Sequence, residues 1–190
     1  MLNIAIIIGS TRPGRNGAAV GKWVYEVAQK RHDAKFELID LLEVNLPFLD
    51  EPAPPSMGKY SKDHTKSWAK RVASFDGYVL VTPEYNHSTS GALKNALDFV
   101  YAEWNNKAAG FVSYGSVGGT RAVEHLRLIM AELQVATVRA QVTLSLHTDF
   151  KDYKEFKPAP AQEKSVEAML DQVIAWSGAL KPLRKKAEAH

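Results

Sequence analysis

Short apolar runs that end in glycine or polar residues recur along the chain and predict buried strands. Residues 3–8 (NIAIII) form the first such run, and YVLVT at 78–82 and AAGFVSY at 108–114 are two more. Runs of this length, rich in β-branched residues and bounded by turn residues, are typical of strands that are covered on both faces. Strands are expected at residues 3–8, 35–40, 78–82, 108–114 and 136–146.

Between these strands, apolar residues return with the period of a helix. In the first such segment, residues 17–31, Val20, Val24 and Val27 fall on one face. Helices are expected at residues 17–31, 61–75, 91–104, 120–134 and 162–180. The connection 43–60, which holds four prolines, and the connection 147–160 are expected to be irregular.

The order of the expected elements, a strand and then a helix repeated five times, favours an α/β fold. Such alternation produces a parallel sheet with helices on both faces. One domain is expected over residues 1–181, and residues 182–190 are expected to form a basic tail in solvent. Because ligands bind beyond the carboxyl ends of the strands in such sheets, the loops after strands one, three and four are the candidate binding loops.

Composition narrows the class of protein further. The 190 residues include no cysteine, which excludes disulfides, thiol nucleophiles and cysteine-bound metals and fits a reducing compartment. The net charge of +3 is too small to indicate nucleic-acid binding. No apolar run approaches the ~20 residues of a membrane span and the N-terminus lacks a signal-peptide pattern, so a cytoplasmic protein is expected. The histidines show no metal-ligand spacing, so no metal site is expected.

The first candidate loop, residues 9–17 (GSTRPGRNG), has the composition of a phosphate site. Its glycines allow the backbone to come close to a ligand, and the N–H groups at the start of the following helix favour an anion. Neutral hydrogen-bonding groups and positive charge are both present. The polar side chains of this loop are Ser10, Thr11, Arg12, Arg15 and Asn16. A plain glycine-rich turn with solvated arginines is the alternative.

Two other nucleotide-binding motifs fail in this loop. A Walker A motif requires Gly-Lys-Ser/Thr at its end, but Gly14 is followed by Arg15 and Asn16. The Rossmann pattern Gly-x-Gly-x-x-Gly fails because residue 11 is threonine. Neither a P-loop nucleotidase nor a Rossmann dinucleotide site is therefore expected.

The second and third loops add groups suited to a flat heteroaromatic ring. Residues 83–91 (PEYNHSTSG) combine a rigid proline, an aromatic ring, an amide and hydroxyl groups. A flat ring needs hydrogen-bonding groups at its edge and an apolar or aromatic surface on its face. Residues 113–119 (SYGSVGG) again allow close backbone approach. Each loop alone is compatible with an ordinary strand–helix connection. Three such loops at one edge of one sheet are a more specific indication of a ligand-binding site.

Together, GSTRPGRNG, PEYNHSTSGALKNALDF and SYGSVGG resemble the NAD(P)H-dependent FMN reductases, a family that includes quinone, azo-dye and chromate reductases. The resemblance implies a flavodoxin-like, doubly wound sheet of five parallel strands in the order 2-1-3-4-5. It also implies a non-covalent FMN cofactor and homodimers or homotetramers that form through the helix 91–104. The sequence departs from the family pattern at Ser90, where many members have proline, and at Arg15 and Asn16, where a small hydroxyl residue is common.

Carried over by position, the resemblance implies three groups of cofactor contacts. The residues that would hold the phosphate are Ser10, Arg12, Arg15, Asn16 and Gly17. Those that would line the isoalloxazine ring are Pro83, Glu84, Tyr85 and Asn86. Those that would close its other side are Tyr114, Gly115 and Gly118. No side chain is expected to act as a catalytic acid or base, although His87 lies beside the ring loop.

The implied reaction passes electrons from NADPH or NADH through FMN to a small acceptor: a quinone, an azo compound, a metal oxyanion or free flavin. For the 2′-phosphate of NADPH, Arg121 and Lys94 are the candidate partners. Two alternatives stay open. One is an electron carrier of flavodoxin type, although such carriers are usually strongly acidic, and the other is a flavin-binding regulatory module without turnover.

Overall fold

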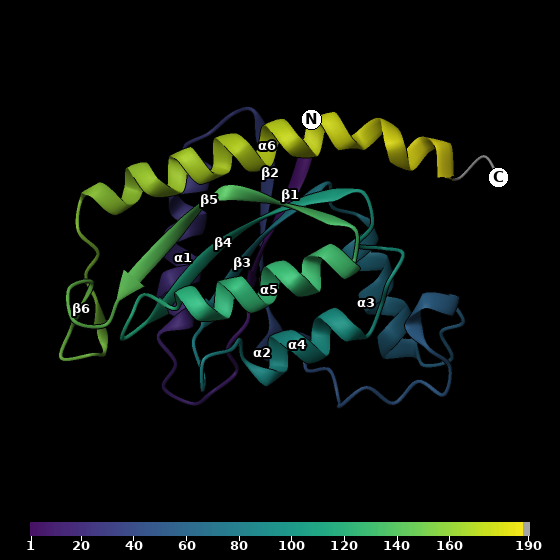
Figure 1. Ribbon diagram of the computed structural model, residues 1–190, viewed down its shortest axis with the longest axis horizontal. Coiled ribbons are helices and arrows are strands. Elements are labelled where there is room, and N and C mark those ends of the chain that lie inside the picture. Colours follow the sequence, from purple (N-terminus) through teal and green to yellow (C-terminus); the bar gives the residue numbers. More distant parts are fainter. Residues whose placement is uncertain (188–190) are drawn as a thin grey trace.

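The computed structural model describes residues 1–187 and contains a five-stranded parallel sheet (Figure 1). The strand order is β2-β1-β3-β4-β5, which confirms the expected order 2-1-3-4-5. The strands are β1 (Leu2–Ile8), β2 (Ala34–Asp40), β3 (Gly77–Pro83), β4 (Lys107–Gly115) and β5 (Val135–Ser145). All four strand pairs are parallel, so the carboxyl ends of the strands meet at one edge.

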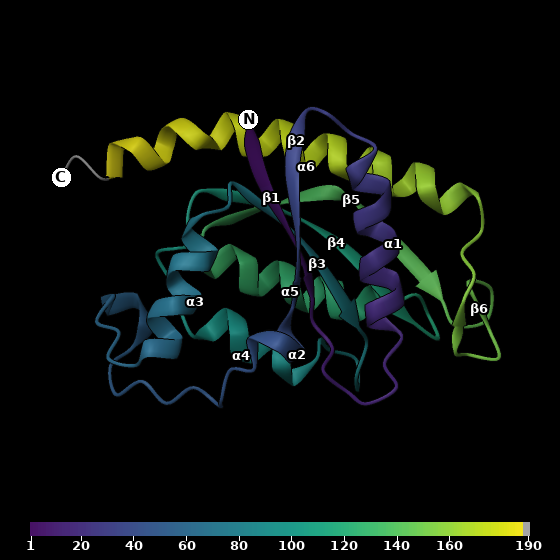
Figure 2. The ribbon, with the colours of Figure 1, turned by 180° about the vertical axis from the view of Figure 1, so that it is seen from behind.

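Helices cover both faces of the sheet. The main helices are α1 (Gly17–Gln29), α3 (Asp63–Ala73), α4 (Gly91–Asp98), α5 (Thr120–Glu132) and α6 (Ala161–Ala187). Residues of β1 alternate between two hydrophobic clusters: Ile4 and Ile6 pack with α1 and α6, whereas Ala5 and Ile7 pack with α3, α4 and α5. Figure 2 shows α1 on the side of the sheet opposite α4 and α5.

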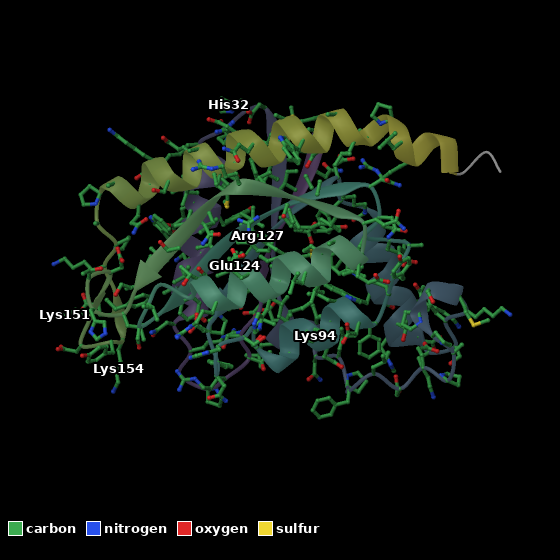
Figure 3. All side chains as sticks on the ribbon, viewed as in Figure 1. His32, Lys94, Glu124, Arg127, Lys151 and Lys154 are labelled. Carbon is green, nitrogen blue, oxygen red and sulfur yellow. The ribbon has the colours of Figure 1, made fainter. Side chains whose placement is uncertain are left out.

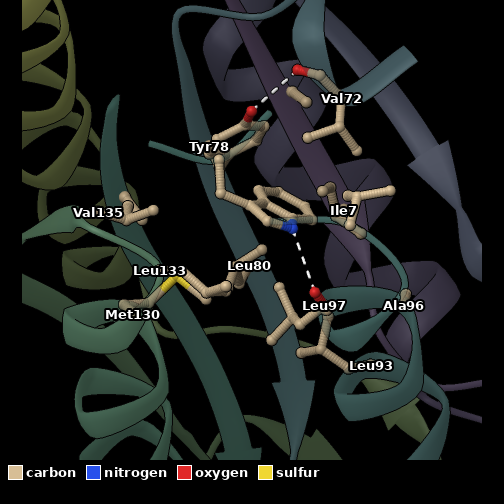
Figure 4. Close-up of a cluster of buried hydrophobic side chains, with 14 of the residues drawn as sticks. Ile7, Val72, Tyr78, Leu80, Leu93, Ala96, Leu97, Met130, Leu133 and Val135 are labelled. Carbon is tan, nitrogen blue, oxygen red and sulfur yellow. Dashed lines mark hydrogen bonds between the residues drawn. The ribbon is translucent and has the colours of Figure 1, made fainter. Parts of the chain in front are cut away.

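The core under α3, α4 and α5 is rich in aromatic side chains whose polar atoms are paired. Trp68 donates to the carbonyl of Ala96 at 2.9 Å. The hydroxyl of Tyr78 donates to the carbonyl of Val72 at 2.9 Å (Figure 4). Large aromatic rings therefore fill this layer without leaving these polar groups unsatisfied.

Three segments between the expected elements differ clearly from the sequence expectation. Helix α4 ends at Asp98 instead of residue 104, because the chain continues in buried turns in which Trp104 donates its backbone N–H to Tyr101. The connection 43–60 begins inside a short helix, α2 (Leu41–Val44), and contains a second one, η1 (Pro55–Met57). The connection 147–160 folds into a hairpin of β6 (Phe150–Lys151) and β7 (Glu155–Phe156). In Figure 3, Lys151 and Lys154 lie on this hairpin at the margin of the molecule.

The expected solvated tail from residue 182 does not describe residues 182–187, which continue α6. Lys181 and Arg184 both form ion pairs with Asp76, a carboxylate whose side chain is only 9% exposed. Arg184 also donates to the carbonyl of Asn106 at 2.9 Å. These contacts fasten the end of the helix to the sheet, so this part of the basic cluster is structural. Residues 188–190 lie outside the described part of the chain.

Within residues 1–187, no helix combines the length and the apolar character that a membrane crossing requires.

Candidate active site

The three predicted loops come together at the carboxyl edge of the sheet and line one cavity of about 80 Å³ that opens to solvent. Eight of the predicted site residues line it, and Leu146 completes the wall. The eight are Arg12, Arg15, Asn16, Pro83, Glu84, Tyr85, Tyr114 and Gly115. The cavity lies where doubly wound sheets bind their ligands, at the point where the strand order reverses between β1 and β3.

The first loop is packed tightly against α4 and the second loop. A Cβ atom on Gly9 would lie 2.9 Å from a methyl carbon of Leu93, so only glycine fits there. The buried hydroxyl of Ser90 donates to the carbonyl of Gly9 at 2.5 Å and accepts the backbone N–H of Leu93 at 3.1 Å. Ser90, which departs from the family pattern, therefore caps α4 and ties the first loop to the second.

The start of α1 is free to receive an anion. Within the described residues, no side chain caps this helix and its first turn contains no acidic residue. The first N–H groups of a helix have no partner inside the helix, and they carry its positive dipole end. Arg12 is exposed beside them. This end of the cavity is therefore suited to a phosphate group.

The guanidinium of Arg15 is paired with groups of the protein and is not free to bind a ligand in the cavity. Its guanidinium donates to both oxygens of Asp40, at 2.6 and 2.5 Å, and also to the carbonyl of Ser10. Asp40 accepts the backbone N–H of Leu42 at 3.0 Å as well, so it caps α2. Arg15 thus braces the first loop against the end of β2, and most of its charge is neutralised.

The second loop contains a tight two-residue turn. Tyr85 and Ser88 exchange two backbone hydrogen bonds of 2.9 and 3.0 Å. Asn86 and His87 between them adopt positive φ angles of 49° and 68°, a conformation that asparagine tolerates better than most residues. Both side chains are exposed, and neither lines the cavity. The hydroxyl of Tyr85 is 2.9 Å from the hydroxyl of Ser10, which fixes the ring of Tyr85 against the first loop.

Glu84 links the second loop to the third. Its backbone N–H donates to the carbonyl of Tyr114 at 3.1 Å. Its carboxylate is 6% exposed and accepts the backbone N–H of Arg121 at 3.1 Å and the Nε–H of Arg121 at 2.6 Å. Burial raises the pKa of Glu84, but the hydrogen bonds and charge of Arg121 outweigh it, and the net pKa lies below its usual value.

Tyr114, in the third loop, carries a buried hydroxyl that has no hydrogen-bond partner among the described residues. A Cβ atom on Gly17 would lie 2.6 Å from this hydroxyl oxygen, so the start of α1 approaches it only because residue 17 is glycine. Burial raises the pKa of Tyr114, and the nearby hydroxyl of Ser10, which pairs with Tyr85 at 2.9 Å, only partly opposes this rise. The phenol therefore stays protonated and able to donate. An unpaired buried hydroxyl costs about 1–3 kcal/mol, and a polar ligand atom in the cavity would remove that cost.

The other predicted residues lie around the cavity rather than in its wall. Ser10 and Gly17 contact wall residues, and Gly118 turns the third loop with a φ of 71°. Thr11 lines a different depression, between α2 and α4. The predicted residues thus divide into those that line the cavity and those that lie outside its wall.

Sequence reasoning missed Asp40 and Leu146, which shape the site, and it named Arg121 only as a candidate partner for a 2′-phosphate. Asp40 and Arg121 pair with loop residues that are 25 and 37 positions away, and neither belongs to a motif. Leu146 follows β5 and donates its backbone N–H to Gly115 at 3.0 Å. The apolar end of the fifth strand was the one available signal, and it marked Leu146 only as part of a strand.

The donor set fits FMN, the cofactor that the resemblance implies. One end of the cavity combines the uncapped start of α1 with Arg12, which suits a phosphate. Tyr114 also lines the cavity, and its unpaired hydroxyl suits a polar ligand atom. Pro83, Glu84 and Tyr85 form a wall suited to the edge and face of a flat ring.

This fold and site define the class of flavodoxin-like proteins, and comparison with known proteins specifies the family. The family model of the NADPH-dependent FMN reductases matches residues 2–149, so the chain belongs to this family. It is 38% identical over 159 residues to an NAD(P)H-dependent FMN reductase of Nectria sp, covering 78% of this chain and 79% of that protein. It is therefore an NAD(P)H-dependent FMN reductase family enzyme.

More distant relatives have names that describe particular acceptors. An FMN-dependent NADPH-azoreductase of Staphylococcus saprophyticus is 28% identical over 176 residues, covering 90% of this chain and 93% of that one. A 2-hydroxy-1,4-benzoquinone reductase of a Burkholderia species is 25% identical over 190 residues, covering 92% and 96%. The solved structure of FerB, an NAD(P)H:(acceptor) oxidoreductase of Paracoccus denitrificans, superimposes with a TM-score of 0.73 at 19% identity, covering 94% and 98%. That structure supports the flavodoxin-like fold.

Proposed function

We propose that this chain binds FMN non-covalently in the three-loop cavity and uses it to pass electrons from NADPH or NADH to a small acceptor. The acceptor classes are those stated from the resemblance: quinones, azo compounds, metal oxyanions and free flavin. The observation that carries the proposal is the unpaired Tyr114 hydroxyl, buried beside the uncapped start of α1. A polar, phosphorylated ligand accounts for both features at once.

The protein's own residues bind and orient the cofactor. Arg12 and the start of α1 hold the phosphate, while Arg15 supports the loop through Asp40. The predicted phosphate contact of Asn16 is replaced by a contact within the protein, because its amide donates to the carbonyl of Tyr153 at 2.9 Å. Pro83, Glu84 and Tyr85 line the cavity and orient the ring, and Tyr114 donates its hydroxyl proton to a polar atom of the ligand.

Bound FMN supplies the two-electron redox chemistry. No side chain is assigned as a catalytic acid or base. His87 is exposed on the turn and is absent from the cavity wall.

The two candidate cations, Arg121 and Lys94, do not indicate a preference for NADPH over NADH. Arg121 is held by Glu84, and Lys94 pairs with Asp98 at 2.6 Å. Both are therefore engaged within the protein, and we propose turnover with NADPH and NADH alike.

As expected from the absence of cysteine, we place the protein in the reducing cytoplasm.

The absorbance spectrum of the purified protein tests the proposal. Flavin absorption bands are expected, and heating should release FMN into the supernatant. Adding NADPH without oxygen should bleach the bands, and adding a quinone should restore them. A colourless protein with no affinity for added FMN contradicts the proposal. A yellow protein that NADPH and NADH fail to bleach instead identifies an electron carrier or a regulatory module.

We also propose that a second copy of this chain covers the face beside α4, as the resemblance implies. Phe48 is 88% exposed, and Leu42 and Leu49 beside it are also exposed. Asn95 of α4 holds this segment, donating to the carbonyl of Pro47 at 2.7 Å and accepting the N–H of Leu49 at 3.0 Å. Exposed apolar side chains on a fixed segment are typical of an interface.

The change Phe48→Ser tests the interface. It is expected to turn a dimer into a monomer in light scattering coupled to gel filtration, because a central aromatic contact is lost. Trp176→Ser, which removes another exposed apolar side chain on α6, across the sheet from α4, is the matched control and should leave the dimer intact. A monomeric unmodified chain contradicts the proposed dimer.

A further inference from the structure

Glu84 and Arg121 form the one ion pair within the described residues that touches the cavity wall and lies outside the first loop. Glu84 is nearly buried, whereas the side chain of Arg121 is 44% exposed. Arg121 lies in the first turn of α5, so the positive end of that helix adds to its charge. A full negative charge and a full positive charge are thus held in fixed positions beside the proposed ring site.

The pair also holds the wall in place. The backbone of Glu84 is hydrogen-bonded to the carbonyl of Tyr114, and Gly115 packs against the side chain of Glu84, whose Cβ would be 3.3 Å from a Cβ at residue 115. Arg121 follows the two left-handed glycines of the third loop, Gly118 and Gly119. Glu84 therefore joins the second loop to the third through three contacts. This rigidity fixes the two charges relative to the cavity.

The two charges act in opposite directions on the redox state of a bound flavin. Two electrons and one proton, which NADPH or NADH supplies as a hydride equivalent, convert neutral oxidised flavin into a reduced ring that carries one negative charge. A positive charge nearby favours the reduced form, and a negative charge favours the oxidised form. Such effects exceed those in water because the cavity is partly shielded from solvent.

We propose that Glu84 and Arg121 are a positioning pair that sets the relative affinity of the site for reduced and oxidised FMN. Arg121 favours the reduced cofactor, and Glu84 limits that preference, so that electrons given by the nicotinamide can still leave for the acceptor. This inference rests on the proposed binding of FMN. It assigns Arg121 a role different from recognition of a 2′-phosphate.

The test measures the dissociation constants of oxidised FMN and of chemically reduced FMN for the unmodified chain and its variants, by fluorescence titration under anaerobic conditions. Glu84→Gln should raise the preference for reduced FMN by roughly fivefold, the size expected for one partly screened charge. Arg121→Gln should lower it by a similar factor. The double variant should return close to the unmodified ratio, because both charges are gone.

Opposite shifts separate an electrostatic role from a merely structural one. If the pair only held the loops, both single variants would weaken the two redox forms alike, and this outcome would overturn the inference. Arg121→Lys retains the charge and should keep the unmodified ratio even if overall affinity falls. Arg71→Gln, which breaks a surface pair with Glu37 of 2.8 Å, is the matched control.

The result also separates this inference from the proposed function. An unmodified chain that binds FMN, together with unchanged ratios in every variant, overturns the positioning pair alone. An unmodified chain that binds neither redox form overturns the proposed function itself.

Discussion

At the scale of single residues, the two arginines of the first loop differ in what they are free to bind. Arg15 is saturated by Asp40 and the carbonyl of Ser10, whereas Arg12 is exposed at the start of α1. The sequence shows two equivalent cations, and only the structure shows that the end of β2 supplies a carboxylate to one of them. Side-chain pairing across 25 residues is a property of the fold, which is why local reasoning treated the two alike.

Arg12→Ala is expected to weaken FMN binding by roughly 1.5–3 kcal/mol, the value of a charge-assisted hydrogen bond, and to leave riboflavin binding nearly unchanged. Arg15→Ala is expected to weaken both ligands, because the loop loses its brace. Titration of each variant with FMN and with riboflavin, which lacks the phosphate, checks this. Equal losses for the two ligands in the Arg12 variant would contradict the assignment.

Tyr114→Phe is expected to weaken FMN binding without lowering the stability of the cofactor-free protein. Removing a hydroxyl that has no partner in the described residues should leave the unfolding free energy of the cofactor-free protein unchanged or raise it by up to about 1 kcal/mol. FMN affinity should fall, since the ligand loses a buried donor. Urea unfolding of the cofactor-free protein and FMN titration measure the two effects. A clear loss of stability would show that the hydroxyl already has a partner.

At the scale of elements, hydrophobic periodicity located every strand of the main sheet to within one residue at its start. It extended α4 too far, because Phe99, Val100 and Trp104 are buried at helical spacing although they lie in turns. It also missed the hairpin of β6 and β7, whose strands have two residues each. Buried apolar residues in turns can have the same spacing as those of a helix. A strand of two residues is too short to show any periodicity.

Ser90→Ala should show how strongly one side chain couples two elements. The variant loses the cap of α4 and the hydrogen bond to Gly9, and it leaves a buried carbonyl without that donor. A loss of roughly 1–3 kcal/mol in unfolding free energy is expected, together with weaker FMN binding. Ser165→Ala removes only a long, exposed hydrogen bond of 3.4 Å within α6 and should cost far less. Chemical denaturation compares the two, and equal losses would argue against the coupling.

At the scale of the whole molecule, the end of the sheet opposite the cavity is held by buried charge. The ammonium of Lys107, at the start of β4, donates to the carbonyl of Val72 and to the hydroxyl of Tyr78, both at 2.9 Å. Asp76 beside it receives Lys181 and Arg184 from α6. The alternating order of strands and helices allowed the architecture to be predicted, but it contained no information about these contacts between distant ends of the chain.

Stability is expected to rise with pH above neutrality. Burial, followed by the charge of Arg184, lowers the pKa of Lys107 from 10.5 to about 7. Between these values the unfolded chain binds more protons than the folded chain, so the unfolding free energy increases by up to about 1.4 kcal/mol per pH unit. Asp76 and Glu103 oppose the shift, and the raised pKa of Tyr78 acts only at higher pH.

Denaturation curves of the unmodified chain and of Lys107→Met between about pH 7 and pH 9 measure this slope. The variant should lose it, because no group remains at that position to titrate. A similar slope in both proteins would assign the effect to other groups.

Helix α6 has a consequence for how the protein is made. It supplies Val166, Met169, Leu170 and Val173 to the hydrophobic layer on the α1 side of the sheet, and its residues are the last of the fold to leave the ribosome. Until they emerge, β4 and β5 present a bare apolar surface on that side of the nascent chain. Synthesis must therefore pass residue 173 before this layer can close, and a chaperone that shields newly made chains would find its binding surface there.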